Sequence, residues 1–192
     1  MKRLLIPLAI QLLISGCAPL ATGSAEITGL SLLHDRRTSK ALVIDERIEI
    51  TAGIELNSRD DTRAECHFNV TAYNGTVLVT GEAPTEALRN KIISIVRIIP
   101  DVKLVHNELK VAPPSSFASR SLDTLITTKV KVALSNIKNL PGFDATRVKV
   151  ITENGIVYLL GLVHSNEGHV ATEVARRENG VKQVVKIFEY ID

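Results

Sequence analysis

The chain has 192 residues, a length that suits one large domain or two small ones. Its 23 basic and 21 acidic side chains nearly cancel, which argues against a nucleic-acid partner bound through bulk charge. With four Phe, three Tyr and no Trp, the chain also lacks the basic and aromatic interleaving of nucleic-acid-binding surfaces.

The segment before Cys17 is built like a bacterial secretion signal. Lys2 and Arg3 give it a positive start, an apolar run follows, and Ser15 and Gly16 are the small residues that a peptidase needs beside its cut. The run is shorter than the about 20 apolar residues that a transmembrane helix needs. Ending on a cysteine resembles a lipoprotein signal, in which the thiol of Cys17 is acylated. A plain secretory signal with a cysteine near the cut is the alternative.

Residues 1–16 are therefore predicted as the signal and residues 17–40 as a lipidated tether. Ala18 follows Cys17, with no Asp at that position. By resemblance to Gram-negative lipoproteins, this implies export to the outer membrane.

The chain contains an internal duplication. Residues 68–81 and residues 148–161 both carry Asn-Gly in the middle and a further Gly six residues later. Because Asn-Gly tolerates the positive φ angles of a type I′ turn, each half is predicted to contain a β-hairpin. One face of each hairpin is apolar: Phe68, Val70, Val77 and Val79 in the first, and Val148, Val150, Val157 and Leu159 in the second.

A helix is expected after each hairpin. The first covers residues 84–99, with Pro84 suited to its first turn. The second covers residues 165–179, with Ser165 or Asn166 as the N-cap. Apolar stripes at helical spacing support them: Leu88, Ile92, Ile95 and Ile99 in the first helix, and Val170, Ala171 and Val174 in the second.

A helix is also expected before each hairpin, and a strand closes each half. The pattern of residues 123–139 is clearly helical, whereas residues 45–57 also suit a strand because they are rich in β-branched side chains. The closing strands are predicted over residues 102–111 and 181–191. Each half is then an α-β-β-α-β unit, an α+β fold in which two helices cover one face of a three-stranded sheet.

The predicted organisation is two tandem domains, at residues 41–112 and 122–192. The Pro-Pro-Ser-Ser run at residues 113–116 begins the linker, which is taken as residues 113–121.

These features resemble BON domains. The hairpin with its Asn-Gly turn, the Gly that ends its second strand, and the segments at residues 69–73, 127–130, 152–155 and 180–184 are similar to that family. Two such units behind Cys17 resemble the dual-BON outer-membrane lipoproteins of the DolP type. The resemblance implies a non-enzymatic protein without cofactors that faces the periplasm and is held by a palmitate-containing lipid anchor.

The resemblance also implies partners. These are anionic phospholipids, phosphatidylglycerol and cardiolipin, with a role in outer-membrane integrity at division sites. The family is linked to the machinery that assembles outer-membrane β-barrels, so an envelope protein-interaction module is the alternative function. Some relatives are labelled small haemolysins, but no pore-forming segment is visible in this sequence.

The family's lipid-binding surface lies on the first helix of the second BON domain. In this chain, Asp123 or Thr124 is expected to cap that helix. A core stripe is expected at Ile126, Val130, Ala133, Leu134 and Ile137. Beside it lie apolar positions that the core does not require, flanked by lysines, an arrangement that suits an anionic membrane surface. The predicted lipid-binding residues are Leu122, Leu125, Ile126, Lys129, Lys131 and Val132.

The first half offers an internal control. Aligning the two helices pairs Leu125 with Arg47 and Lys129 with Thr51. The first helix is also acidic, with Asp45, Glu46, Glu49 and Glu55. The first half is therefore predicted to bind anionic lipid poorly.

Three observations leave this site open. Val132 pairs with Ile54, so one apolar position persists in the first half. Some relatives carry an aromatic residue in place of Leu125, and an aromatic side chain would anchor better at the interface. The alternative role for Leu125 and Val132 is packing against the other domain or against Phe117.

Other titratable side chains show no catalytic or metal-binding pattern. Cys66 and His67 could form half of such a site, but a small buried strand residue is the preferred interpretation of Cys66. Asp60 and Asp61 are expected in a polar loop. The five histidines are interpreted as surface or structural residues: His34, His67, His106, His164 and His169. No catalytic residue and no metal ligand is predicted.

Overall fold

The computed structural model describes residues 35–191, so Cys17 and the predicted signal lie outside the described part of the chain. The first half contains α2 (Ser39–Asn57), α3 (Asp60–Glu65), β1 (His67–Tyr73), β2 (Thr76–Ala83), α4 (Glu86–Arg97) and β3 (Leu104–Val111). The second contains α5 (Phe117–Ser135), the 3-10 turn η1 (Ala145–Arg147), β4 (Val148–Glu153), β5 (Ile156–Val163), α6 (Ser165–Ala175) and β6 (Gln183–Tyr190).

Both predicted hairpins are confirmed. Asn74 and Gly75 have φ angles of 51° and 80°, and Asn154 and Gly155 have 54° and 77°. These left-handed pairs are those of type I′ turns, whose twist matches the strands on either side. The turn fixes the register, which pairs β1 with β2 and β4 with β5 antiparallel.

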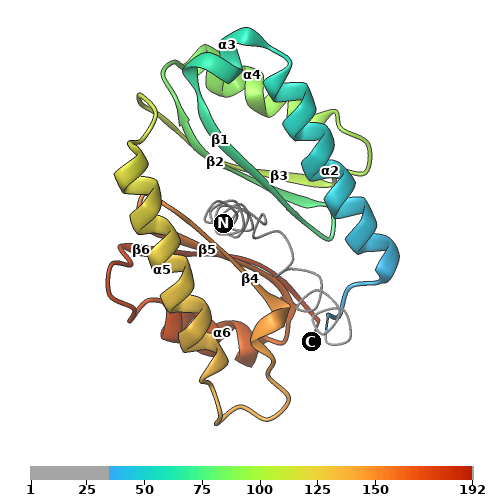
Figure 1. Ribbon diagram of the computed structural model, residues 1–192. Coiled ribbons are helices and arrows are strands. Elements are labelled where there is room, and N and C mark those ends of the chain that lie inside the picture. The colour runs from blue at the N-terminus through green and yellow to red at the C-terminus, as the bar shows by residue number, and fades with distance from the viewer. Residues whose placement is uncertain (1–34, 192) are drawn as a thin grey trace, which may run out of the picture. The chain divides into compact units, whose positions relative to one another are not determined.

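Each half forms a three-stranded sheet with the hairpin's second strand in the centre. β3 pairs parallel to β2 and β6 pairs parallel to β5, so α4 and α6 are the crossover connections. In Figure 1, α2 and α4 lie over one face of the first sheet, and α5 and α6 lie over one face of the second. The predicted apolar hairpin faces contribute to the two cores beneath these helices. The α+β fold class is confirmed.

The helix starts differ from the prediction where an unexpected side chain forms the cap. α2 is a helix throughout and starts at Ser39, and α5 starts at Phe117, before the expected Asp123 or Thr124. Ser116 is the N-cap of α5, because its side chain accepts a hydrogen bond from the Ser119 N–H. Residues 117–121, expected in the linker, are therefore helical.

The other boundaries shift by smaller amounts. Thr85 caps α4, so Pro84 lies before the helix rather than in its first turn. His164 is the N-cap of α6, not Ser165 or Asn166, and the helix ends at Ala175. Asp60 and Asp61 open the short helix α3 rather than a loop. Cys66, at the end of α3, packs partly buried against the core just before β1, and its burial raises the pKa of its thiol.

The sheet faces away from the helices share a third apolar cluster. Tyr73 and Leu78 of the first sheet gather there with Tyr158, Leu160 and Ile187 of the second. Polar contacts border it, including a 3.2 Å hydrogen bond from the Leu162 N–H to the Tyr73 hydroxyl. The contact between the domains therefore uses mainly the sheets. Helix side chains lie at its border, where Glu49 of α2 pairs with Lys149 and Arg120 of α5 lies 3.4 Å from His67.

Candidate functional site

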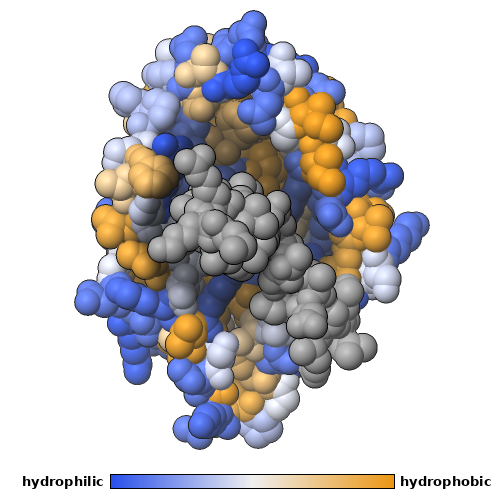
Figure 2. All heavy atoms as spheres, in the orientation of Figure 1, coloured by the Kyte–Doolittle hydropathy of each residue, from blue (hydrophilic) through white to orange (hydrophobic). Residues whose placement is uncertain are grey.

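The outer face of α5 exposes the apolar side chains that the core does not need. Leu122 is 60 % exposed, and Leu125 and Val132 are each 56 % exposed. Since these side chains are exposed within residues 35–191, they do not pack against the other domain, and Phe117 is exposed as well. Figure 2 shows hydrophobic side chains gathered over α5 and also over α2.

Ile126 is a core residue rather than a surface residue. It is 8 % exposed and packs with Val130 and Leu134 in the second core, as the helical spacing predicted for the core stripe. A membrane would meet its neighbours Leu122 and Leu125 first, so a lipid contact by Ile126 itself stays a prediction.

A hollow of about 300 Å³ lies between α5 and the turn after β4. Its apolar wall is Leu122, Leu125 and Ile126, and it also has two lysines, Lys129 and Lys182. The Lys182 ammonium donates a 3.1 Å hydrogen bond to the Asn154 carbonyl, at the turn. The hollow thus joins exposed apolar side chains to two cations. Lys131 is exposed on α5 but does not line it.

Asp123 is the residue that positions α5 against this turn. It is buried, and its carboxylate accepts hydrogen bonds of 2.9 Å from the Asn154 N–H and 2.8 Å from the Gly155 N–H. From its position in the sequence, Asp123 is predicted as a helix cap, whereas the structure shows it bound to the turn. The sequence signal for this role is the repeat, because the first half also has an Asp, Asp45, before its Asn-Gly turn.

The first half contains the equivalent hollow, of about 220 Å³. The Asp45 carboxylate accepts hydrogen bonds of 2.7 Å from the Asn74 N–H and 2.8 Å from the Gly75 N–H. The Lys103 ammonium donates a 2.8 Å hydrogen bond to the Asn74 carbonyl. Asp101 lines this hollow and forms an ion pair with Arg47 of α2.

The two helices differ in charge but both expose apolar side chains, so poor lipid binding by the first half stays a prediction. Arg47 stands where the second half has Leu125, as the alignment predicted. However, α2 still exposes three large apolar residues: Val43, Ile50 and Ile54. Exposed apolar surface alone therefore does not separate the two helices.

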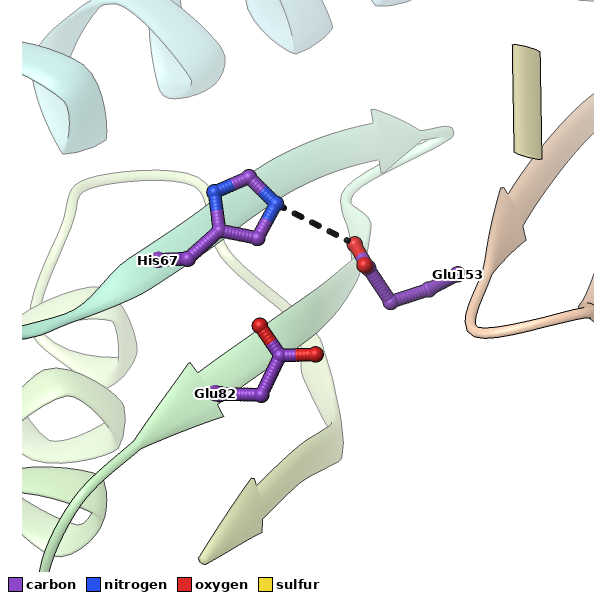
Figure 3. A group of neighbouring side chains, drawn as sticks. All are labelled: His67, Glu82 and Glu153. Atoms are coloured by element: carbon purple, nitrogen blue, oxygen red, sulfur yellow. Dashed lines mark ion pairs between the residues drawn. The ribbon is translucent and has the colours of Figure 1, made fainter. Parts of the chain in front are cut away.

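A second group of side chains gathers where the two domains meet. His67, Glu82 and Glu153 each offer a ligand atom, and these atoms all lie within 4.8 Å of one another (Figure 3). Burial and the nearby Glu82 carboxylate raise the pKa of Glu153 to about 7. Sequence spacing could not reveal this group, because its members come from β1, β2 and β4.

No helix in residues 35–191 combines the length and the apolar character needed to cross a membrane.

Comparisons with known proteins agree with the fold and the duplication. The model of the BON domain matches residues 54–113 and 122–192. The chain is 33 % identical to "Outer membrane lipoprotein DolP" of Haemophilus influenzae, over 100 % of this chain and 97 % of that protein. It is 34 % identical to a "21 kDa hemolysin" of Actinobacillus pleuropneumoniae, over 82 % of this chain and 79 % of that protein.

A solved structure of the C-terminal domain of CdsD, a structural protein of the Type III secretion system of Chlamydia trachomatis, shows a weak likeness. Its TM-score is 0.30 at 12 % identity, with 77 % of this chain and 67 % of that chain covered. The two domain matches and the full-length relative confirm the resemblance seen in the sequence. The chain belongs to the BON-domain family and is an outer-membrane lipoprotein with two such domains.

Proposed function

We propose that this protein is a non-enzymatic lipoprotein that faces the periplasm and binds anionic phospholipid through α5 of its second BON domain. Cys17 carries the lipid anchor, and the bound lipids are phosphatidylglycerol and cardiolipin. Through this contact the protein supports outer-membrane integrity at division sites.

The observation that carries the proposal is the exposed face of α5 beside a hollow with two lysines. Leu122, Leu125 and Val132 are each more than half exposed, so their transfer into the acyl boundary would be favourable by roughly 1 kcal/mol apiece. Lys129 and Lys182 stand beside them in the hollow, and each lysine near an anionic surface adds about 1 kcal/mol. A phosphate headgroup could enter the hollow while the acyl chains meet the leucines.

The anchor explains why modest affinity is enough. Once Cys17 holds the chain at the bilayer, the second contact becomes intramolecular and is favoured by a high effective concentration. The α5 face then selects which lipids lie beneath the domain rather than bringing the protein to the membrane.

We assign no catalytic role to the hollow. Its lining is mainly apolar side chains, backbone of the turn and two lysines. Its one carboxylate, Asp123, is already occupied by the two backbone N–H groups of the turn.

The test is flotation with vesicles, using a form of the chain that begins at Ser24 and so lacks Cys17. Vesicles with and without phosphatidylglycerol are compared. The expected result is binding that requires the anionic lipid and falls at least about tenfold in Leu125→Glu. The matched control is Ile54→Glu, which places the same charge on an exposed apolar position of α2 and should leave binding unchanged.

Absence of binding by the unsubstituted form would contradict direct lipid recognition. Equal losses in Leu125→Glu and Ile54→Glu would contradict the assignment to α5.

A second candidate is an envelope protein-interaction module, for example with the β-barrel assembly machinery. The observation that favours it is the face of α2, where Val43, Ile50 and Ile54 are exposed among acidic side chains. Such a face suits a protein groove with a basic rim rather than an anionic membrane. The name of the second relative adds a membrane-damaging activity to the alternatives, which lysis of red cells by the purified protein would test.

A further inference from the structure

His67, Glu82 and Glu153 form a compact group of ligating atoms between the two BON domains. His67 opens β1 and is paired across the hairpin with Glu82 of β2, so the first domain holds two of the three side chains in register. Glu153 ends β4 of the second domain. Its Oε2 lies 3.6 Å from His67 Nε2, as the dashed line in Figure 3 shows.

Two buried carboxylates meet here, and the one side chain beside them that could carry a positive charge as an ion-pair partner in residues 35–191 is His67. Glu82 is 3 % exposed and Glu153 is 4 % exposed. In the described part of the chain, no Lys or Arg forms an ion pair with either one. Buried like charges at this separation are costly unless a cation or a proton balances them.

The neutral donors around the carboxylates satisfy only part of their hydrogen-bonding capacity. Asn69 Nδ2 donates to Glu153 at 3.1 Å, and the Ser115 N–H donates to Glu82 at 3.0 Å. Asn154 Nδ2 also donates to Glu82. An ionised carboxylate has about four acceptor sites, so each retains capacity for a further ligand.

Thr80 lies beside this group. It is two residues from Glu82 on the same face of β2 and is 1 % exposed. Its hydroxyl approaches Glu153, but among residues 35–191 it has no hydrogen-bond partner of good geometry, so this buried oxygen keeps capacity for a further ligand.

We propose that His67, Glu82 and Glu153 bind one divalent cation of the Zn²⁺ class at the junction of the two domains. One imidazole nitrogen and two carboxylate oxygens are a donor set that Zn²⁺ accepts, whereas Ca²⁺ takes six to eight oxygens and soft ions prefer thiolates. A divalent charge would neutralise both carboxylates. A water molecule would complete the four-coordinate shell of the bound ion.

One pair of ligand atoms already has nearly the spacing that such an ion requires, and all three lie within 4.8 Å of one another. Two ligands on a tetrahedral Zn²⁺ are separated by about 3.4 Å, and His67 Nε2 and Glu153 Oε2 are already 3.6 Å apart. Binding at Nε2 places the ring proton on Nδ1, which now lies 3.4 Å from the Arg120 guanidinium. Arg120 is exposed on α5, so its side chain can turn away when the ion binds.

The site would tie the two domains together, because its ligands come from both. A bound ion would therefore stabilise the arrangement in which the sheets share their apolar cluster.

The test is calorimetric titration of Zn²⁺ into the mature lipoprotein, purified in detergent and dialysed against a chelator. The expected result is one ion per chain, with affinity at least about tenfold lower in each of His67→Ala, Glu82→Gln and Glu153→Gln. The matched control is His169→Ala on α6, an exposed histidine outside the cluster, which should bind as the unsubstituted chain does.

Thermal unfolding keeps the test decisive if one variant folds poorly. Zn²⁺ should raise the unfolding temperature of the unsubstituted chain and of His169→Ala, but not that of Glu153→Gln. Absence of Zn²⁺ binding would overturn the proposal, as would affinity that the three cluster variants leave unchanged. If Glu153→Gln is more stable while Zn²⁺ has no effect on the unsubstituted chain, a proton balances the charges and the proposal is wrong.

Discussion

The hollow beside α2 and the hollow beside α5 share a scaffold and differ at the rim. In both, a buried Asp of the helix holds the Asn-Gly turn and a lysine donates to the turn's carbonyl. At the rim, the first half has the Arg47–Asp101 ion pair, where the second has Leu125 and Gly180. Parts that hold the fold together are thus repeated, while the parts that face a partner have diverged.

Charge separates the two helices more than apolar exposure does. α2 and α5 each expose at least three large apolar side chains. α2 carries four acidic and two basic residues, whereas α5 carries one acidic and three basic residues. An anionic membrane should therefore prefer α5 even though both helices have apolar surface to offer.

The shared scaffold predicts the largest effect, a loss of stability on removing either aspartate. Asp123→Ala leaves two N–H groups of the turn, one buried and one partly buried, without acceptors and should lower the free energy of unfolding by about 3 kcal/mol. Asp45→Ala should cost somewhat more, because Asp45 also pairs with the mostly buried Arg37 at 2.8 Å. Urea unfolding measures both. A loss under about 1 kcal/mol would show that the Asn-Gly turns are stable without the aspartates.

Structural features decided by neighbouring residues could be predicted from the sequence, whereas features decided by distant contacts could not. The hairpins followed from Asn-Gly between alternating strands, because a turn's geometry is decided by its own residues. The start of α5 did not follow, since Ser116 stands in a Pro-Ser run that suggested a linker, and Asp123 looked like a cap. In the sequence, a short polar residue that caps a helix looks the same as one that hydrogen-bonds to a distant hairpin turn.

The candidate site divides in the same way. Exposure of Leu122, Leu125 and Val132 was predictable from helical spacing, because the core stripe leaves them no place inside. The hollow with Lys182 was not, since that lysine arrives from the loop before β6.

Replacing the rim residues of the hollow beside α5 with those of the hollow beside α2 should abolish much of its lipid binding. Leu125→Arg with Gly180→Asp recreates the ion pair across the hollow and removes an apolar contact, and binding to phosphatidylglycerol vesicles should fall about tenfold. Gly180 has a φ of 101°, so the aspartate adds strain, and Leu125→Arg alone is the unstrained companion. Unchanged flotation by both variants would mean that the rim does not face lipid.

The reverse exchange should produce a smaller gain in the first half. Arg47→Leu with Asp101→Gly opens the hollow beside α2, and vesicle binding should rise by about threefold, since the acidic side chains of α2 remain. Stability should change little, because the Arg47–Asp101 pair is largely exposed. If vesicle binding by the altered first half equalled that of the second half, the rim residues alone, and not the charge of the helix, would determine which half binds lipid.

The smallest effect is expected from the lysine that the two hollows share. Lys182→Gln should weaken vesicle binding about twofold to threefold at low salt, because an exposed ammonium contributes at most about 1 kcal/mol near an anionic surface and salt screens it. Lys103→Gln is the matched control, since Lys103 makes the same hydrogen bond to its own turn but lies beside the acidic α2. Flotation is measured across a salt series, and the difference between the two variants should vanish as salt rises. Equal losses at low salt would mean that both hollows approach the membrane, and charge on α2 would then no longer explain why the second domain is preferred.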